Sequence, residues 1–287
     1  MYIFIRLKRI AMISFVIIAV SFSAVFISTF KNDFTAKAEE SIKVPIIMYH
    51  HILKDKSKSG KYIITPEEFK EDLKYIKEKG YTTVTIKDLI NYVDGNGTLP
   101  QKPIILTFDD GHESNYAYIY PIIKETRDKI VISVVGKYSE EFSKDEESHI
   151  SYSYLKWNEI KEMHDSGLVE IANHSFDCHD QNKRKGINKK KSETDEEYKK
   201  FLINDLSSLN LKLKEVTGET PLTFTYPFGH YQKKSVDIIK DIGFKATLSC
   251  EEGVNCIEKN NPECLFLLKR YNRPSGVSVK KILAESN

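Results

Sequence analysis

Two adjacent carboxylates follow an apolar run in the segment Thr107–Gly111, which reads Thr-Phe-Asp-Asp-Gly. Neighbouring side chains at the end of a strand can point in different directions. One carboxylate can then bind a cation while the other stays free to accept a proton. Asp-Asp-Gly is also a favourable turn sequence, so this segment alone does not distinguish a catalytic pair from a structural turn.

Two histidines and a carboxylate lie close together in the segment His174–His179, directly after the mostly apolar run 168–172. Two imidazoles and one carboxylate can form a facial set on a divalent metal that leaves positions open for water and substrate. A lone histidine is more often structural, but two near the end of one predicted strand favour metal ligation. Four other histidines are interpreted as structural residues: His112, His149, His164 and His230.

Two further segments also end predicted strands. Residues 225–229 read Thr-Tyr-Pro-Phe-Gly, and aromatic residues around Pro and Gly make a rigid ledge that suits a sugar ring and can aim a backbone N–H at an oxyanion. An ordinary proline-containing turn is the alternative. In the first strand of the domain His50 and His51 are adjacent, and because side chains alternate along a strand, we expect only one of them to face the site.

These segments end short apolar runs that alternate with longer amphipathic stretches, the pattern of a β/α architecture. Candidate strands span residues 44–52, 82–85, 103–108, 130–135, 168–173, 222–226 and 244–248, with an eighth candidate at 265–268. Candidate helices begin at the cap residue Thr65 and end before Gly80, and span 158–166 and 198–217. Seven or eight such units predict an α/β fold of (β/α) barrel type, complete or incomplete, with catalytic groups at the carboxyl ends of the strands.

The composition is that of a folded domain. The 287 residues carry 43 basic and 41 acidic side chains, a formal net charge of +2. This balance gives no electrostatic basis for nucleic-acid binding, so we expect no nucleic-acid partner. The charged stretch at 181–197 is interpreted as a solvated loop that leads into a helix, with contact to an anionic polymer as the alternative.

The amino-terminal segment differs from the rest of the chain. Three basic side chains, Arg6, Lys8 and Arg9, precede residues 10–30, which carry no formal charge. A helix over this run would cover roughly the 30 Å of a bilayer core. The preceding basic residues place the amino terminus in the cytoplasm and the remainder outside the membrane. Residues 1–30 are therefore predicted to be a membrane anchor or signal segment, with membrane contact through 10–30.

A signal peptide cleaved after Ala38 is the alternative, because residues 36–38 read Ala-Lys-Ala, a small-x-small cleavage pattern. The apolar run is long for a signal peptide, which favours a retained anchor. In either case residues 31–43 form a linker, and 44–287 form the catalytic or binding domain, which lies outside the membrane. Export would permit a disulfide among three clustered cysteines, although their spacing selects no pair: Cys250, Cys256 and Cys264.

The motifs together resemble those of a known family. Three segments, in this order, are similar to the first three motifs of the polysaccharide deacetylases, also called NodB-homology or carbohydrate esterase family 4 enzymes: 107–111, 174–179 and 226–229. The resemblance runs from about Val44 to Arg270. The opening segment 44–51 and the late segment 268–270 are similar to the branch that includes deacetylases of biofilm poly-N-acetylglucosamine.

The resemblance implies a distorted (β/α) barrel of seven or eight units and hydrolysis of N-acetyl groups from N-acetylglucosamine units. Asp110, His174 and His179 would hold a divalent metal, with Zn²⁺ as the first choice and Co²⁺ or Ni²⁺ as substitutes. The partner would be a polysaccharide that contains N-acetylglucosamine, either an exopolysaccharide or peptidoglycan. The two histidines are five residues apart, whereas the wider family has a spacing of four, and the longer spacing fits the exopolysaccharide branch.

The remaining roles also follow from the resemblance. Asp109 would be the general base that deprotonates metal-activated water, and the backbone N–H of Phe228 would meet the oxyanion, with Tyr226 beside the substrate. The late histidine that supplies the general acid in much of the family is missing here. In the branch resembled, the histidine of the opening strand takes this role, which maps to His50, with the adjacent His51 as the alternative.

Two other function classes use the same sequence features. A membrane-anchored glycan-binding module without catalysis would keep the fold and the aromatic ledge, but the presence of Asp109, Asp110, His174 and His179 disfavours it. An O-acetyl esterase that acts on another polysaccharide would use the same residues as the N-deacetylase. Metal content and a substrate panel would distinguish these alternatives.

Overall fold

The computed structural model describes residues 41–144 and 147–285. The predicted anchor or signal segment at 1–30, the cleavage site after Ala38 and most of the predicted linker lie outside these ranges. Within the described ranges, no helix combines the length and the hydrophobicity needed to cross a membrane.

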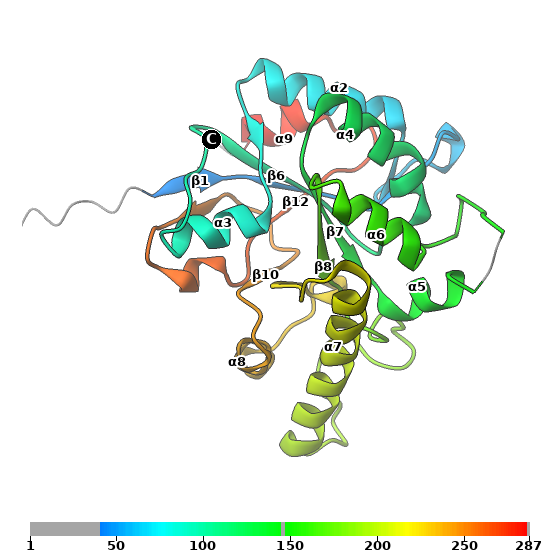
Figure 1. The fold of residues 1–287 in the computed structure, drawn as a ribbon, viewed down its shortest axis with the longest axis vertical. Helices are drawn as coiled ribbons and strands as arrows, with labels where there is room; N and C mark the ends of the chain where they lie inside the picture. Colours follow the sequence, from blue (N-terminus) through cyan, green and yellow to red (C-terminus); the bar gives the residue numbers. More distant parts are fainter. Residues whose placement is uncertain (1–40, 145–146, 286–287) are drawn as a thin grey trace, which may run out of the picture. The chain divides into compact units, whose positions relative to one another are not determined.

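An eight-stranded parallel sheet organises the domain (Figure 1). Its main path runs in the order β10 (Ala246–Leu248), β9 (Thr223–Thr225), β8 (Val169–Asn173), β7 (Ile130–Val134), β6 (Pro103–Phe108), β2 (Ile46–Tyr49) and β12 (Tyr271–Asn272). Strand β5 (Thr82–Thr83) pairs with β6 beside this path. The sheet is curled and its path ends at β10 and β12, so the described strands form an open half-barrel and not a closed barrel.

Helices connect the strands and cover the sheet: α2 (Pro66–Glu78), α3 (Ile86–Val93), α4 (Tyr120–Thr126), α5 (Gly136–Phe142), α6 (Trp157–Asp165), α7 (Asp195–Thr217), α8 (Lys233–Ile242) and α9 (Val279–Glu285). The predicted start of α2 is confirmed, because Thr65 and Glu68 cap each other's backbone N–H groups. Helix α7 starts a few residues earlier than predicted, where Thr194 forms a second capping box with Glu197.

The predicted first strand is divided into three short strands: β1 (Ile42–Val44), β2, and β3 (His51–Ile52). Strand β1 pairs with β11 (Asn255–Ile257), and β3 pairs with β4 (Ile63–Ile64). The predicted eighth strand at 265–268 is wrong. A 3-10 turn ends at Leu265, and a left-handed backbone at Leu267 (φ 60°) interrupts any extended run. Leu268 forms only an isolated bridge to Leu248 of β10, so the last strand is β12 instead.

Both faces of the central strand β6 are buried. Ile104 and Leu106 belong to one hydrophobic cluster, whereas Ile105 between them belongs to another on the opposite face. Packing on both sides fixes the position of this strand. The carboxylates that follow its last residue, Phe108, are therefore held at a defined place.

Candidate active site

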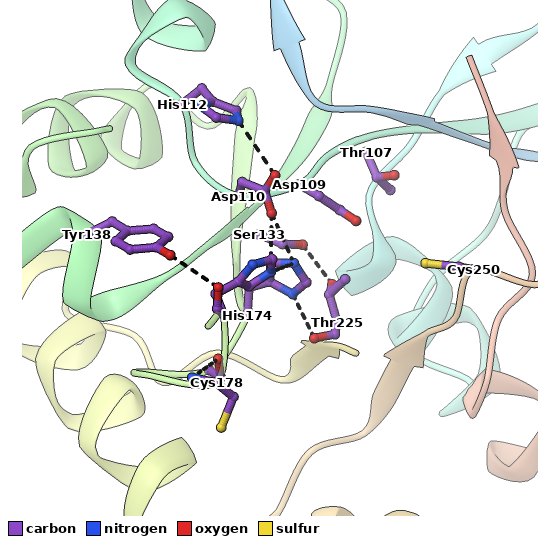
Figure 2. A network of polar contacts seen from close by, with 12 residues as sticks. Thr107, Asp109, Asp110, His112, Ser133, Tyr138, His174, Cys178, Thr225 and Cys250 are labelled. Atoms are coloured by element: carbon purple, nitrogen blue, oxygen red, sulfur yellow. Dashed lines mark hydrogen bonds and ion pairs between the residues drawn. The ribbon is translucent and has the colours of Figure 1, made fainter. Parts of the chain in front are cut away.

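All the predicted site residues except Tyr226 converge on one cavity at the carboxyl ends of the parallel strands. Its volume is about 680 Å³. The predicted residues that line it are His50, Asp109, Asp110, His174, His179 and Phe228. Figure 2 shows His112 and His174 on opposite sides of Asp110. The site is thus built from the ends of four strands that lie far apart in the sequence: β2, β6, β8 and β9.

Asp110, His174 and His179 form the candidate metal site. The Oδ1 atom of Asp110 lies 3.4 Å from His174 Nε2 and 3.3 Å from His179 Nε2, and the two Nε2 atoms are 2.9 Å apart. His174 Nδ1 lies 2.8 Å from the carbonyl oxygen of Thr225, which can only accept, so Nδ1 carries the hydrogen and a neutral ring keeps a lone pair on Nε2. Two imidazole nitrogens and one carboxylate oxygen that converge in this way fit a divalent cation.

Burial and neighbouring charges set the protonation of these groups. Burial opposes the ionised form of Asp110, but its contacts with His112 and His174 outweigh burial and hold the pKa of Asp110 well below its usual range. Burial and the nearby His174 lower the pKa of His179 to about 4. At pH 7 Asp110 is therefore a carboxylate and His179 a neutral imidazole, which are the forms that ligate metal. Burial also lowers the pKa of His174, but Asp110 and Asp109 outweigh it and the net direction is upward.

The backbone is left-handed at three non-glycine positions beside the site: Asp110 (φ 72°), Ser175 (φ 72°) and Phe228 (φ 57°). Such conformations cost of order 1–3 kcal/mol each and persist only where the surroundings hold them. At Ser175 the backbone N–H donates to Asn173 Oδ1 at 2.8 Å. The left-handed turn at Asp110 separates the two adjacent carboxylates. The carboxylate of Asp110 lies beside the histidines, whereas the carboxylate of Asp109 contacts a different partner.

That partner is Arg270, which lies in the segment before β12. Its Nη1 and Nη2 atoms donate to the two oxygens of Asp109 at 2.7 and 2.8 Å, and both side chains are buried. Burial raises the pKa of Asp109, but the guanidinium outweighs it and the net pKa is below the usual value. Asp109 is thus ionised at neutral pH, as a proton acceptor must be.

The structure distinguishes the two adjacent histidines of the opening strand. His51 is held through both ring nitrogens, by the hydroxyl of Ser114 at 2.8 Å and the carbonyl of Ser151 at 3.2 Å. His50 Nδ1 has no hydrogen-bond partner among the described residues, and its ring packs on Tyr62. Both residues line the cavity, but both ring nitrogens of His51 are already engaged. His50 is the one whose nitrogens are left for chemistry.

The two aromatic residues of the predicted ledge lie in different surroundings. The ring of Phe228 is 37% exposed and lies 4.5 Å from the ring of His179, centroid to centroid. Tyr226 is fully buried and packs on Phe224 and Tyr231, away from the cavity. The expectation that Tyr226 lies beside the substrate is therefore not met: its side chain faces the core because Thr225 and Tyr226 alternate across the strand end.

Comparison with known proteins agrees with this geometry. A family model described as "Polysaccharide deacetylase" matches residues 96–247, which is more than half of the chain. The chain belongs to the polysaccharide deacetylase family. The resemblance inferred from the motifs is thus confirmed, and deacetylation of polysaccharides is the reaction class of the family.

Relatives of this deacetylase include two poly-beta-1,6-N-acetyl-D-glucosamine N-deacetylases. The protein from Staphylococcus aureus (strain MRSA252) is 27% identical over 195 residues, which cover 67% of this chain and 62% of the relative. The protein from Escherichia coli (strain K12) is 23% identical over 224 residues, which cover 71% of this chain but only 33% of the relative. A solved de-N-acetylase from Aggregatibacter actinomycetemcomitans has the same fold, with a TM-score of 0.71, 22% identity and coverage of 84% of this chain and 99% of that one.

Two residues of the deacetylase site were not assigned a role from the sequence. Arg270 was noted only as part of a late motif, and no spacing rule connects it to Asp109. His112 was interpreted as structural, yet its Nε2 lies 3.5 Å from Asp110 Oδ2 and its ring packs on His51 at 4.2 Å. His112 directly follows the Asp-Asp-Gly turn, and that position was the one available signal.

The remaining sequence features lie outside the ligand set. All four cysteines, which fall within the described ranges, are free thiols, so no disulfide joins Cys250, Cys256 and Cys264. In the charged stretch the basic side chains pair locally, for example Arg184 with Glu193 and Lys189 with Asp195. This pairing supports the interpretation of a solvated loop.

Proposed function

We propose that this deacetylase hydrolyses the N-acetyl groups of N-acetylglucosamine units in a cell-surface polysaccharide, with a divalent metal held by Asp110, His174 and His179. The observation that carries the proposal is the separation of the adjacent carboxylates. Asp110 faces two imidazole nitrogens, whereas Asp109 is ionised by contact with Arg270 and lies in the same cavity. One carboxylate is thus available as a ligand and the other as a base.

The reaction adds water to the acetamide carbonyl carbon and breaks the C–N bond, which yields acetate and a free amine. When bound, a divalent cation such as Zn²⁺, Co²⁺ or Ni²⁺ would polarise the carbonyl and make the attacking water more acidic. Asp109 accepts the proton of that water, and the backbone N–H of Phe228 would meet the developing oxyanion. His50 donates a proton to the leaving amine.

The electrostatics of His50 set a condition on its role. Burial lowers the pKa of His50, and the charges of Asp109 and Asp110 act in the opposite direction without reversing it. The ring is therefore neutral at pH 7 in the free site. To act as the acid it must first receive a proton within the site, and the water proton taken up by Asp109 is the available source.

The proposed substrate is based on the names of two relatives, and the proposed location on the uncharged amino-terminal segment. Because the two named relatives act on poly-beta-1,6-N-acetyl-D-glucosamine, we propose an exopolysaccharide of this type as the substrate, ahead of peptidoglycan. The chain spans about a third and just under two thirds of their lengths. We further propose that residues 10–30 anchor the protein in the cell membrane with the catalytic domain outside.

The proposal is tested by acetate release from poly-N-acetylglucosamine and from purified peptidoglycan, measured side by side with metal content. Asp110→Ala and His174→Ala should lose bound metal and acetate release together. Asp109→Asn should keep the metal and lose turnover. Unchanged acetate release from Asp109→Asn would rule out the base assignment, and failure on both glycans with metal bound would favour an O-acetyl esterase.

A further inference from the structure

The loop between the two candidate histidine ligands is held from outside the cavity by helix α7. The carboxylate of Asp205, in the middle of this helix, accepts hydrogen bonds from the backbone N–H groups of Phe176 and Asp177 at 2.8 and 2.9 Å. These two N–H groups belong to consecutive residues of the loop between His174 and His179. One side chain of α7 therefore fixes the middle of the segment that joins the two ligands.

The same helix also fixes the start of the loop. The Nδ2 atom of Asn173, the residue before the first histidine, donates to the carbonyl of Leu206 at 3.0 Å and to Oδ1 of Asn210 at 2.8 Å. Its Oδ1 accepts the N–H of Ser175, whose backbone is left-handed. The hydroxyl of Ser175 in turn accepts the N–H of Cys178 at 3.1 Å.

These contacts leave little freedom in the path from one ligand to the other. Loss of the Asp205 carboxylate would leave two N–H groups of the loop without an acceptor, a cost that favours rearrangement of the backbone. Rearrangement would change the separation of the two Nε2 atoms, now 2.9 Å. The candidate ligands themselves do not contact Asp205, so any effect on them must pass through the loop.

We propose that Asp205 is a positioning residue for the metal site, which sets the spacing of His174 and His179 through the backbone of the loop between them. The inference rests on the proposed function, because it assumes that these histidines bind metal. Residues of this kind, which orient ligands without touching the metal, typically change metal affinity by 10–100-fold when they are mutated. Helix α7 is thus part of the metal site although none of its side chains is a ligand.

The test is metal affinity of the full chain, measured by competition with a chromophoric chelator for Zn²⁺, together with the absorption spectrum of the Co²⁺ form. Asp205→Ala should weaken Zn²⁺ binding by about 10–100-fold and alter the Co²⁺ spectrum. Asp205→Asn keeps one oxygen acceptor and should fall between Asp205→Ala and the unmodified chain. Asn204→Ala, an exposed neighbour on the same helix, should leave both measurements unchanged.

A control for general destabilisation is Leu213→Ala, which removes a buried contact of α7 about two turns beyond Asp205. It should lower the melting temperature of the metal-free protein while its Zn²⁺ affinity stays within about twofold. If Asp205→Asn and Asp205→Ala both bind Zn²⁺ normally, or if Leu213→Ala weakens binding as much as they do, the positioning role is refuted. Failure of the metal site itself would be seen separately, as normal Zn²⁺ binding by Asp110→Ala.

Discussion

Replacement of Arg270 by methionine would remove the partner of a buried carboxylate and leave the aliphatic volume nearly unchanged. Asp109 is 3% exposed and Arg270 is fully buried, and the two share two hydrogen bonds of 2.7 and 2.8 Å. Loss of one partner of such a pair typically costs about 3–5 kcal/mol, because the other charge stays buried without compensation. For a domain of this size that cost corresponds to a fall in melting temperature of roughly 6–20 °C.

Urea unfolding at pH 7 in the presence of a chelator would measure this free energy without a contribution from bound metal. The double variant Arg270→Met with Asp109→Asn should recover at least half of the loss, since the unpaired charge is gone. A matched control is Lys245→Met, which breaks a partly exposed ion pair with Asp94 at 2.8 Å and should cost less than about 1 kcal/mol. A cost below 1 kcal/mol for Arg270→Met, or no coupling to Asp109, would refute the reasoning.

Three further predictions concern single residues. His50→Gln should abolish acetate release while Zn²⁺ affinity stays normal, and a variant with more than a tenth of normal turnover would remove His50 from the mechanism. Burial raises the pKa of Glu159 to about 7, so the folded state keeps this proton to higher pH than the unfolded chain does, and stability falls as pH rises toward 7. Glu159→Gln should remove roughly 1–3 kcal/mol of this pH-dependent loss. A dependence of unfolding free energy on pH that the mutation leaves unchanged would contradict the prediction. Gly229 has φ 68°, and a Cβ there would lie 2.7 Å from Cβ of Cys250. Gly229→Ala should therefore lower the melting temperature. Adding Cys250→Gly to this variant should restore part of the lost melting temperature, unless the backbone strain at Gly229 is the whole cause.

The local elements could be predicted because their signals are local. Strand β6 was predicted with its observed bounds, since a fully buried strand is a continuous apolar run. The start of α2 was predicted from the cap residue Thr65 and its partner Glu68. The segment at 265–268 was misassigned because its buried residues belong to a 3-10 turn (Leu265) and to an isolated bridge (Leu268), and burial alone does not identify a strand.

The candidate metal site was predicted in two steps. The positions after predicted strands indicated a metal site with two histidines, because the carboxyl ends of parallel strands meet at one edge. The choice of Asp110 as the third ligand came from the resemblance to the family. The orientation of Tyr226 could not be predicted, because it depends on which face of the strand end is buried. The contact of Arg270 with Asp109 joins residues 161 positions apart, and no local pattern records a contact of that kind.

The position of Arg270 in the fold explains why the ionisation of Asp109 depends on parts of the domain that are distant in the sequence. The sheet path ends at β10 and β12, and the segment that leads to β12 lies across this opening, where Leu268 bridges to Leu248 of β10. Arg270 follows two residues later and donates through Nε to the carbonyl of Ser249 at 2.8 Å as well as to Asp109. The guanidinium that ionises the base is thus supplied by the segment that joins the two ends of the half-barrel. The contact that keeps Asp109 ionised, with a residue 161 positions away in the sequence, therefore depends on the carboxyl-terminal segment lying beside β10.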